Sequence, residues 1–156
     1  MTSARRVKYH VSMVLEKIKQ IFRGPTPDNK HIKILVVEDN EVDMKVACAA
    51  IDRGGYSAIK AYDGKTGLEM VQSRLPDLII LDYNLPDIQG PEICKILKGD
   101  NATRHIPVLF VTSMDSPGSV IDCYEKGGEN YLYKPIKPKF LLKQIEQTLQ
   151  DRKLAQ

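Results

Sequence analysis

Short apolar runs alternate with amphipathic segments along most of this chain. Five runs are nearly continuous in aliphatic and aromatic residues, at positions 33–37, 57–62, 77–81, 107–111 and 130–133. Continuous rather than alternating apolar character is typical of parallel strands that are buried on both faces. The pattern therefore predicts a five-stranded parallel sheet at the centre of the fold.

The segments between these runs contain helix signals. Starts and stops are marked by Asn40 (with Asp43 three residues on), Gly54, Gly55, Asp63, Pro91, Pro117 and Pro138. Asn and Asp cap helices, glycine ends them, and proline suits their first turn. In the last helix the residues at core spacing are Phe140, Leu141, Ile145 and Leu149. Five strand–helix repeats predict an α/β fold with helices on both faces of the sheet.

The first part of the chain departs from this repeat. The stretch "GPTPDNK" (residues 24–30) contains two prolines and a glycine and cannot continue a helix. Before it, apolar residues recur at helical spacing opposite a basic face, at Val7, Val11, Val14, Leu15, Ile18, Ile21 and Phe22. We therefore predict an N-terminal basic amphipathic helix at 1–23, a linker at 24–31 and one domain at 32–152.

The charge supports the same division of the 156 residues. Residues 1–33 contain eight basic and two acidic residues, a net charge of +6, whereas the whole chain has +3 and the remainder therefore −3. A split of this kind often marks a separate interaction segment. No apolar run approaches the roughly 20 residues that a membrane span needs, and the N-terminus lacks the pattern of a signal peptide.

The three cysteines, Cys48, Cys94 and Cys123, form no CxxC pair and are odd in number. This usage favours reduced thiols in a protein core rather than a disulfide framework. Together with the lack of targeting signals, it predicts a cytoplasmic protein.

Polar residues follow four of the five predicted strands. They are Glu38 and Asp39 after the first, Asp82 after the third, Thr112 and Ser113 after the fourth, and Lys134 and Pro135 after the fifth. Ligands of such sheets bind beyond the carboxyl ends of the strands, where groups from neighbouring strands converge. Any one of these acids alone fits a helix cap or a solvated loop, so the argument depends on the set.

Three carboxylates in one cleft repel each other unless a cation lies between them. Oxygen ligands suit Mg²⁺, or Mn²⁺ in its place. With Glu38, Asp39 and Asp82, one divalent cation and Lys134, the formal charges cancel. Such a site can accept further negative charge.

The stretches "VVEDN", "LIILDYNLPDIQG", "VLFVTS" and "YLYKP" occur in the order and spacing of a known family. Through them, residues 32–150 resemble the receiver domain of two-component response regulators. Single-domain members, such as the chemotaxis regulator and phosphorelay intermediates, are the most similar in organisation. The resemblance implies a flavodoxin-like, doubly wound (βα)5 fold with strand order 2-1-3-4-5, to which the N-terminal helix is added.

The resemblance also implies a chemical role for the acids. Asp82 would be the phosphoacceptor, attacking a phosphohistidine on a sensor histidine kinase or a histidine phosphotransferase. Mg²⁺ would be held by Glu38, Asp39, Asp82 and the backbone carbonyl of Asn84. The protein would be a signalling protein rather than an enzyme, with self-catalysed phosphoryl transfer and slow autodephosphorylation only.

Other positions correspond to the phosphoryl-binding and switching parts of the family. Lys134 would pair with a phosphoryl oxygen, and Thr112 would hydrogen-bond the phosphoryl group. Tyr131 matches the aromatic residue that turns inward when Thr112 moves. The Lys134–Pro135 peptide bond is a cis candidate. Asn84 and Met114 stand where the family tunes the access of hydrolytic water, and the bulk of Met114 could slow dephosphorylation.

Several alternatives remain open for partners and for mechanism. The readout face would comprise the fourth helix, fifth strand and fifth helix of the domain (residues 117–150). It would contact an unknown downstream protein, since no output domain follows, or form a homodimer. The N-terminal helix could pack on the receiver, form a homodimer, dock a partner protein or lie on a membrane surface. No motif of direct DNA binding accompanies its charge.

The chain could also relay its phosphoryl group to a histidine phosphotransferase. A haloacid-dehalogenase-like phosphohydrolase is disfavoured, because Asp82-Tyr83-Asn84 lacks the second acid of that family's DxD. A degenerate receiver used only for protein contacts is disfavoured by the complete set of site residues.

Overall fold

The computed structural model describes residues 29–113 and 119–155 of the chain. The predicted N-terminal helix, residues 24–28 of the predicted linker, Met114 and Pro117 lie outside these residues. Five parallel strands form one sheet in the order β2-β1-β3-β4-β5, as predicted. They are β1 (Lys33–Val37), β2 (Ser57–Ala61), β3 (Leu78–Asp82), β4 (Val108–Thr112) and β5 (Asn130–Tyr133).

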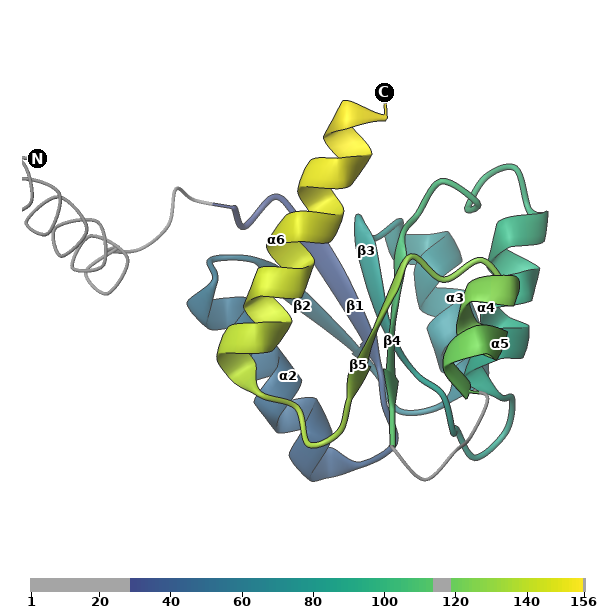
Figure 1. Ribbon diagram of the computed structural model, residues 1–156, viewed down its shortest axis with the longest axis horizontal. Coiled ribbons are helices and arrows are strands. Elements are labelled where there is room, and N and C mark those ends of the chain that lie inside the picture. The colour runs from purple at the N-terminus through teal and green to yellow at the C-terminus, as the bar shows by residue number, and fades with distance from the viewer. Residues whose placement is uncertain (1–28, 114–118, 156) are drawn as a thin grey trace, which may run out of the picture.

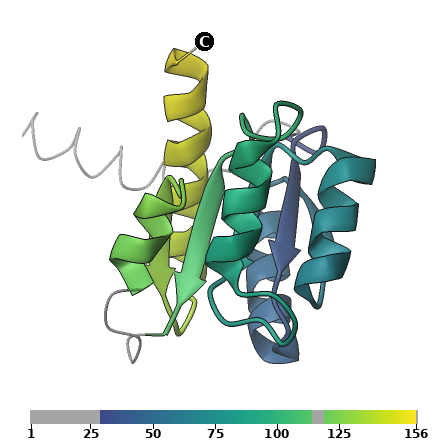
Figure 2. The same ribbon diagram turned by 90° about the vertical axis from the view of Figure 1, so that its right-hand side faces the viewer.

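Helices cover both faces of this sheet (Figure 1). Helices α2 (Glu41–Arg53) and α6 (Pro138–Leu154) lie on one face. On the other face lie α3 (Gly64–Arg74), α4 (Gly90–Gly99) and α5 (Ser119–Glu125), seen side by side in Figure 2. Every residue of β3 and β4 is buried. The continuous apolar runs of β3 and β4 therefore reflect central strands covered on both sides.

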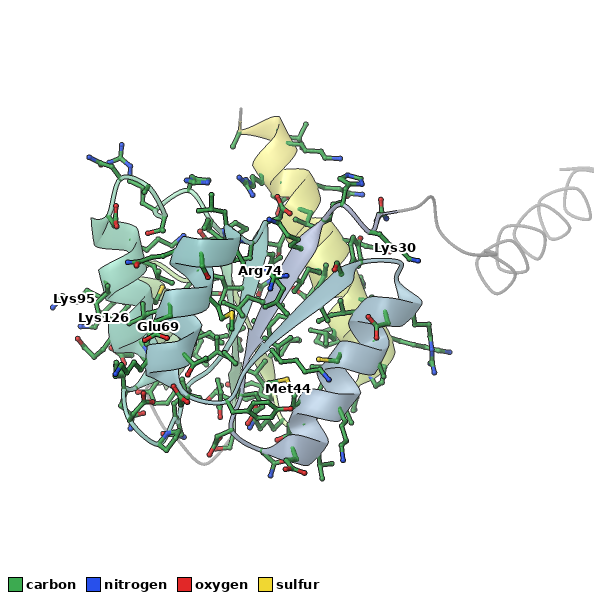
Figure 3. All side chains as sticks on the ribbon, turned by 180° about the vertical axis from the view of Figure 1, so that it is seen from behind. Lys30, Met44, Glu69, Arg74, Lys95 and Lys126 are labelled. Carbon is green, nitrogen blue, oxygen red and sulfur yellow. The ribbon has the colours of Figure 1, made fainter. Side chains whose placement is uncertain are left out.

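The two faces of the sheet each contribute to a separate apolar cluster. One cluster joins α2 and α6 to the sheet and includes Met44 and Ile145; Met44 points from α2 toward the strands (Figure 3). The other joins α3, α4 and α5 to the opposite face and includes Phe110. Cys48, Cys94 and Cys123 are buried free thiols, which confirms their predicted place in the core.

Two details differ from the sequence expectations. Asp82 and Thr112 are the last residues of β3 and β4 rather than the first residues beyond them, because Tyr83 N–H still donates to the carbonyl of Val111, at 2.9 Å. Phe140 is 50% exposed, although it was predicted in the core. The buried side of α6 is formed by Leu141, Ile145 and Thr148, and Phe140 lies just outside that stripe.

Within residues 29–113 and 119–155, no helix has the length and apolar character needed to cross a membrane.

Candidate functional site

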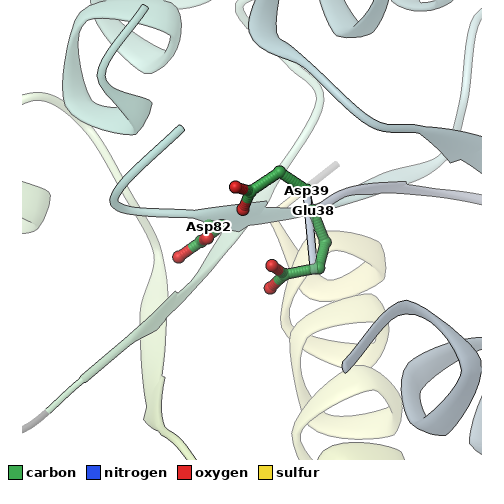
Figure 4. A group of neighbouring side chains, drawn as sticks. All are labelled: Glu38, Asp39 and Asp82. Atoms are coloured by element: carbon green, nitrogen blue, oxygen red, sulfur yellow. The ribbon is translucent and has the colours of Figure 1, made fainter. Parts of the chain in front are cut away.

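The strand register places Glu38, Asp39 and Asp82 at one edge of the sheet. Val37 ends β1 beside Leu81 of β3, so the residues that follow each of them, Glu38 and Asp82, reach the same level. One carboxylate oxygen from each of Glu38, Asp39 and Asp82 lies within 4.8 Å of the others. Figure 4 shows the three side chains converging at this edge.

These carboxylates differ in their exposure to solvent. Glu38 and Asp82 are only 3% and 5% exposed, whereas Asp39 is exposed. Glu38 also accepts a hydrogen bond from the backbone N–H of Asn40, at 3.0 Å. Asn40 in turn caps α2 by accepting from the N–H groups of Val42 and Asp43. The cap of α2 and the acidic cluster are therefore one connected structure.

Lys134, directly after β5, provides the positive charge of the site. Its Nζ lies 2.8 Å from Glu38 Oε2, 3.4 Å from Asp82 Oδ2 and 3.0 Å from Asp43 Oδ2. The ion pair with Asp43 was not predicted, because the sequence indicated only a partner of the Asn40 cap. Its position four residues after Asp39, in the first turn of a helix that begins at the site, was the available signal.

Burial, and after it the negative charge of Glu38, raise the pKa of Asp82 to about 7. Lys134 and the N–H of Asn84, which lies 3.4 Å from Asp82 Oδ1, act in the opposite direction. For Lys134, burial alone would lower the pKa, but hydrogen bonds to Glu38 and Asp43 and the charge of Asp82 raise it above its usual value. The site therefore holds more carboxylate charge than one lysine neutralises.

The donor set at this site fits a hard divalent cation. It consists of oxygen atoms, three of them on carboxylates within 4.8 Å of one another. Mg²⁺ binds a small number of protein oxygens and keeps several waters, which agrees with a site that is buried on one side and open at Asp39.

The loop that follows Asp82 is held by its backbone. The N–H of Gly90 donates to the carbonyl of Tyr83 at 2.8 Å. A Cβ at position 90 would lie 2.2 Å from the carbonyl oxygen of Asp82, so the closure needs glycine there. In the same loop, Asp87 accepts from the N–H groups of Gly64 and Lys65 at 2.7 and 2.8 Å, and these bonds lower its pKa. The loop is thereby joined to the first turn of α3.

The predicted switch residues lie on the two neighbouring strands β4 and β5. Thr112 is completely buried, and its hydroxyl donates to the carbonyl of Ser113 at 3.3 Å. Tyr131 is half-buried and makes edge-to-face contacts with the rings of Tyr124 and Tyr133, at centroid distances of 5.8 and 5.4 Å. The peptide bond between Lys134 and Pro135 is cis.

Comparison with known proteins identifies the family of this arrangement. The sequence model of the response regulator receiver domain family matches residues 34–146. The chain is 38% identical over 109 residues to the polar-differentiation response regulator DivK of Brucella anthropi, covering 69% of this chain and 89% of DivK. It is 38% identical over 113 residues to the response regulator PleD of Caulobacter vibrioides, covering 72% of this chain and only 25% of PleD.

A solved structure gives the same result for the fold. The chemotaxis response regulator CheY4 of Vibrio cholerae superposes with a TM-score of 0.70 at 28% identity, covering 74% of this chain and 97% of that one. The chain therefore belongs to the response regulator receiver domain family, whose members are signalling proteins.

Proposed function

We propose that this protein accepts a phosphoryl group on Asp82 from a phosphohistidine of a sensor histidine kinase or histidine phosphotransferase. The observation that supports this most strongly is the convergence of Glu38, Asp39 and Asp82, with Lys134 Nζ 3.4 Å from Asp82. Phosphoryl transfer needs positioning and charge neutralisation more than covalent help. A rigid carboxylate with a lysine beside it meets both needs.

In the transfer, the N–P bond of the phosphohistidine breaks and the imidazole leaves with the electron pair. One carboxylate oxygen of Asp82 forms the new O–P bond. Lys134 pairs with a phosphoryl oxygen, and its raised pKa keeps it charged. Receiver domains bind Mg²⁺ through acidic residues; here Glu38, Asp39, Asp82 and the Asn84 carbonyl would hold it. The ion would neutralise charge on the transferred group.

The acyl phosphate adds negative charge and acceptor oxygens beside Thr112. We propose that the Thr112 hydroxyl turns to donate to the phosphoryl group and that Tyr131 then moves inward. This biases a two-state element through a local charge. The face formed by α5, β5 and α6 is the proposed readout surface for a downstream protein, and it exposes Tyr124, Tyr133 and Phe140.

The experiment incubates the full-length protein with Mg²⁺ and a small phosphodonor such as acetyl phosphate, and measures intact mass. We expect one added phosphoryl group on the wild type and none on Asp82→Asn. Glu69→Gln is the matched control, because Glu69 is an exposed acid of α3 outside the acidic cluster and should leave the label intact. An unlabelled wild type, or equal label on Asp82→Asn, contradicts the proposal.

A further inference from the structure

Helix α5 is held to the rest of the domain by few side chains. It has seven residues, and among positions 120–125 only Cys123 is buried, at 1% exposure. Just beyond the helix, Lys126 pairs with Glu92 of α4 at 3.4 Å; Lys126 is labelled in Figure 3. Glu92 is about half-exposed, and exposed ion pairs of this kind contribute little to stability.

A hydrogen bond from Tyr83, the residue after Asp82, adds to these contacts. The hydroxyl of Tyr83 donates to Asp122 Oδ2 of α5 at 3.1 Å. A bond to a carboxylate is stronger than one between neutral groups, and Tyr83 is half-buried against the apolar cluster of that face. On a helix with one buried side chain in the described positions, this bond is a large part of the attachment.

Tyr83 is itself a rigid anchor. It follows Asp82 directly, and its backbone is fixed on both sides: its N–H donates to Val111, and its carbonyl accepts from Gly90. Tyr124, two positions after Asp122 on α5, contacts the ring of Tyr131. The helix is therefore linked both to the loop of the phosphoacceptor and to the proposed switch aromatic.

We propose that Tyr83 is a positioning residue that tethers α5 in the unswitched arrangement through Asp122. This inference rests on the proposed function, because it assigns the tether to the resting state of the readout face. In the switched state α5 would move with the Tyr131 ring that Tyr124 contacts. Such a movement breaks the Tyr83–Asp122 bond, so the bond favours the unphosphorylated state. Because coupling is reciprocal, loss of the tether favours phosphorylation.

The first test follows α5 directly in the unphosphorylated, full-length protein. Amide hydrogen exchange over residues 119–125 should become about tenfold faster in Tyr83→Phe, the factor expected for loss of one hydrogen bond to a charged group. Tyr62→Phe, a change at an exposed tyrosine after β2, is the matched control and should exchange like the wild type. Asp122→Asn keeps an acceptor oxygen and should have a smaller effect than Asp122→Ala. Wild-type exchange in Tyr83→Phe overturns the tether.

The second test separates positioning from mere structural support. With Mg²⁺ and a small phosphodonor, the initial rate of Asp82 labelling should rise several-fold in Tyr83→Phe while the midpoint of urea unfolding falls slightly. A labelling rate that stays the same or falls together with the midpoint would make Tyr83 a structural residue only and overturn the inference. An unlabelled wild type would instead refute the proposed function, and the exchange measurement would still decide the tether.

Discussion

Asp82 and Glu38 are both nearly buried carboxylates, although they repel each other and burial disfavours their charge. Lys134 contacts both, and it also contacts Asp43. One lysine therefore pairs with three acids and cannot neutralise all of their charge. The remaining repulsion makes the protein less stable without a cation than its packing alone would allow. A bound cation would relieve this repulsion, so the same residues that lower the stability of the metal-free protein favour binding of a cation and a phosphoryl group.

The first prediction concerns the pH dependence of stability in metal-free buffer. The folded pKa of Asp82 is raised to about 7, whereas an unfolded chain has a value near 4. As pH rises from about 4 to about 7, the unfolded carboxyl loses its proton and the folded one keeps it, so stability falls across this window and stays low above it. Asp82→Asn should therefore raise the free energy of unfolding at pH 8, by at most about 4 kcal/mol.

The measurement is urea unfolding with a chelator present at several pH values. The gain in Asp82→Asn should shrink toward zero below about pH 4, where Asp82 is protonated in both the folded and the unfolded protein. The charged groups facing Asp82, which are Glu38, Asp39 and Lys134, remain in both proteins. If the free energies of unfolding of the two proteins differed by the same amount at every pH, the pKa of Asp82 would not be raised by its surroundings. Added Mg²⁺ should stabilise the wild type more than the variant.

At the scale of elements, the connection from β3 to α4 sets the position of Asp82. Gly90 begins α4, and its missing side chain lets the helix start against the carbonyl of Asp82. In Gly90→Ala the new Cβ would meet backbone atoms, 2.2 Å from the Asp82 oxygen and 3.1 Å from the Tyr83 Cα. We expect a loss of about 2 kcal/mol in urea unfolding and slower labelling of Asp82, because the loop has to shift.

Gly99, at the other end of the same helix, is the matched control. A Cβ there meets nothing within 4 Å, so Gly99→Ala should be neutral or stabilising by up to about 1 kcal/mol. It should also label at the wild-type rate. A loss in Gly99→Ala as large as that in Gly90→Ala would mean that close contact with the carbonyl of Asp82 does not determine the effect.

The sequence predicted the elements well because their signals are local. Continuous apolar runs marked the strands, and Asn40 and Asp63 cap α2 and α3 as expected. Contacts between distant side chains left no such signal. The Asp43–Lys134 ion pair and the Tyr83–Asp122 hydrogen bond join residues far apart in the chain, and only the tertiary structure brings them together. Phe140 was misassigned because neighbouring residues on a helix point in different directions, so Leu141 is buried while Phe140 is exposed.

At the scale of the whole molecule, the acidic site and the N-terminal segment meet the sheet at opposite ends of its strands. The acidic site lies at the carboxyl ends of the strands, whereas the described chain enters at Asn29, just before the start of β1. A pocket of about 410 Å³ at that entrance is lined by Asn29, Ile32, Tyr56 and Leu149. The last turns of α6 extend past the sheet there (Figure 1). The basic segment of residues 1–28 thus joins the domain at the edge opposite the site.

This separation predicts that deleting residues 1–25 leaves phosphorylation of Asp82 intact. The labelling rate and the urea midpoint should match those of the full chain, because the described contacts of the site lie within residues 38–134.

If the segment forms a homodimer through its apolar stripe, the mass in solution should halve on deletion and stay unchanged in Lys17→Glu/Lys19→Glu. If it binds a membrane surface, both variants should lose co-sedimentation with anionic vesicles, as the wild type should at high salt. Loss of Asp82 labelling on deletion would show instead that the segment contributes to the site.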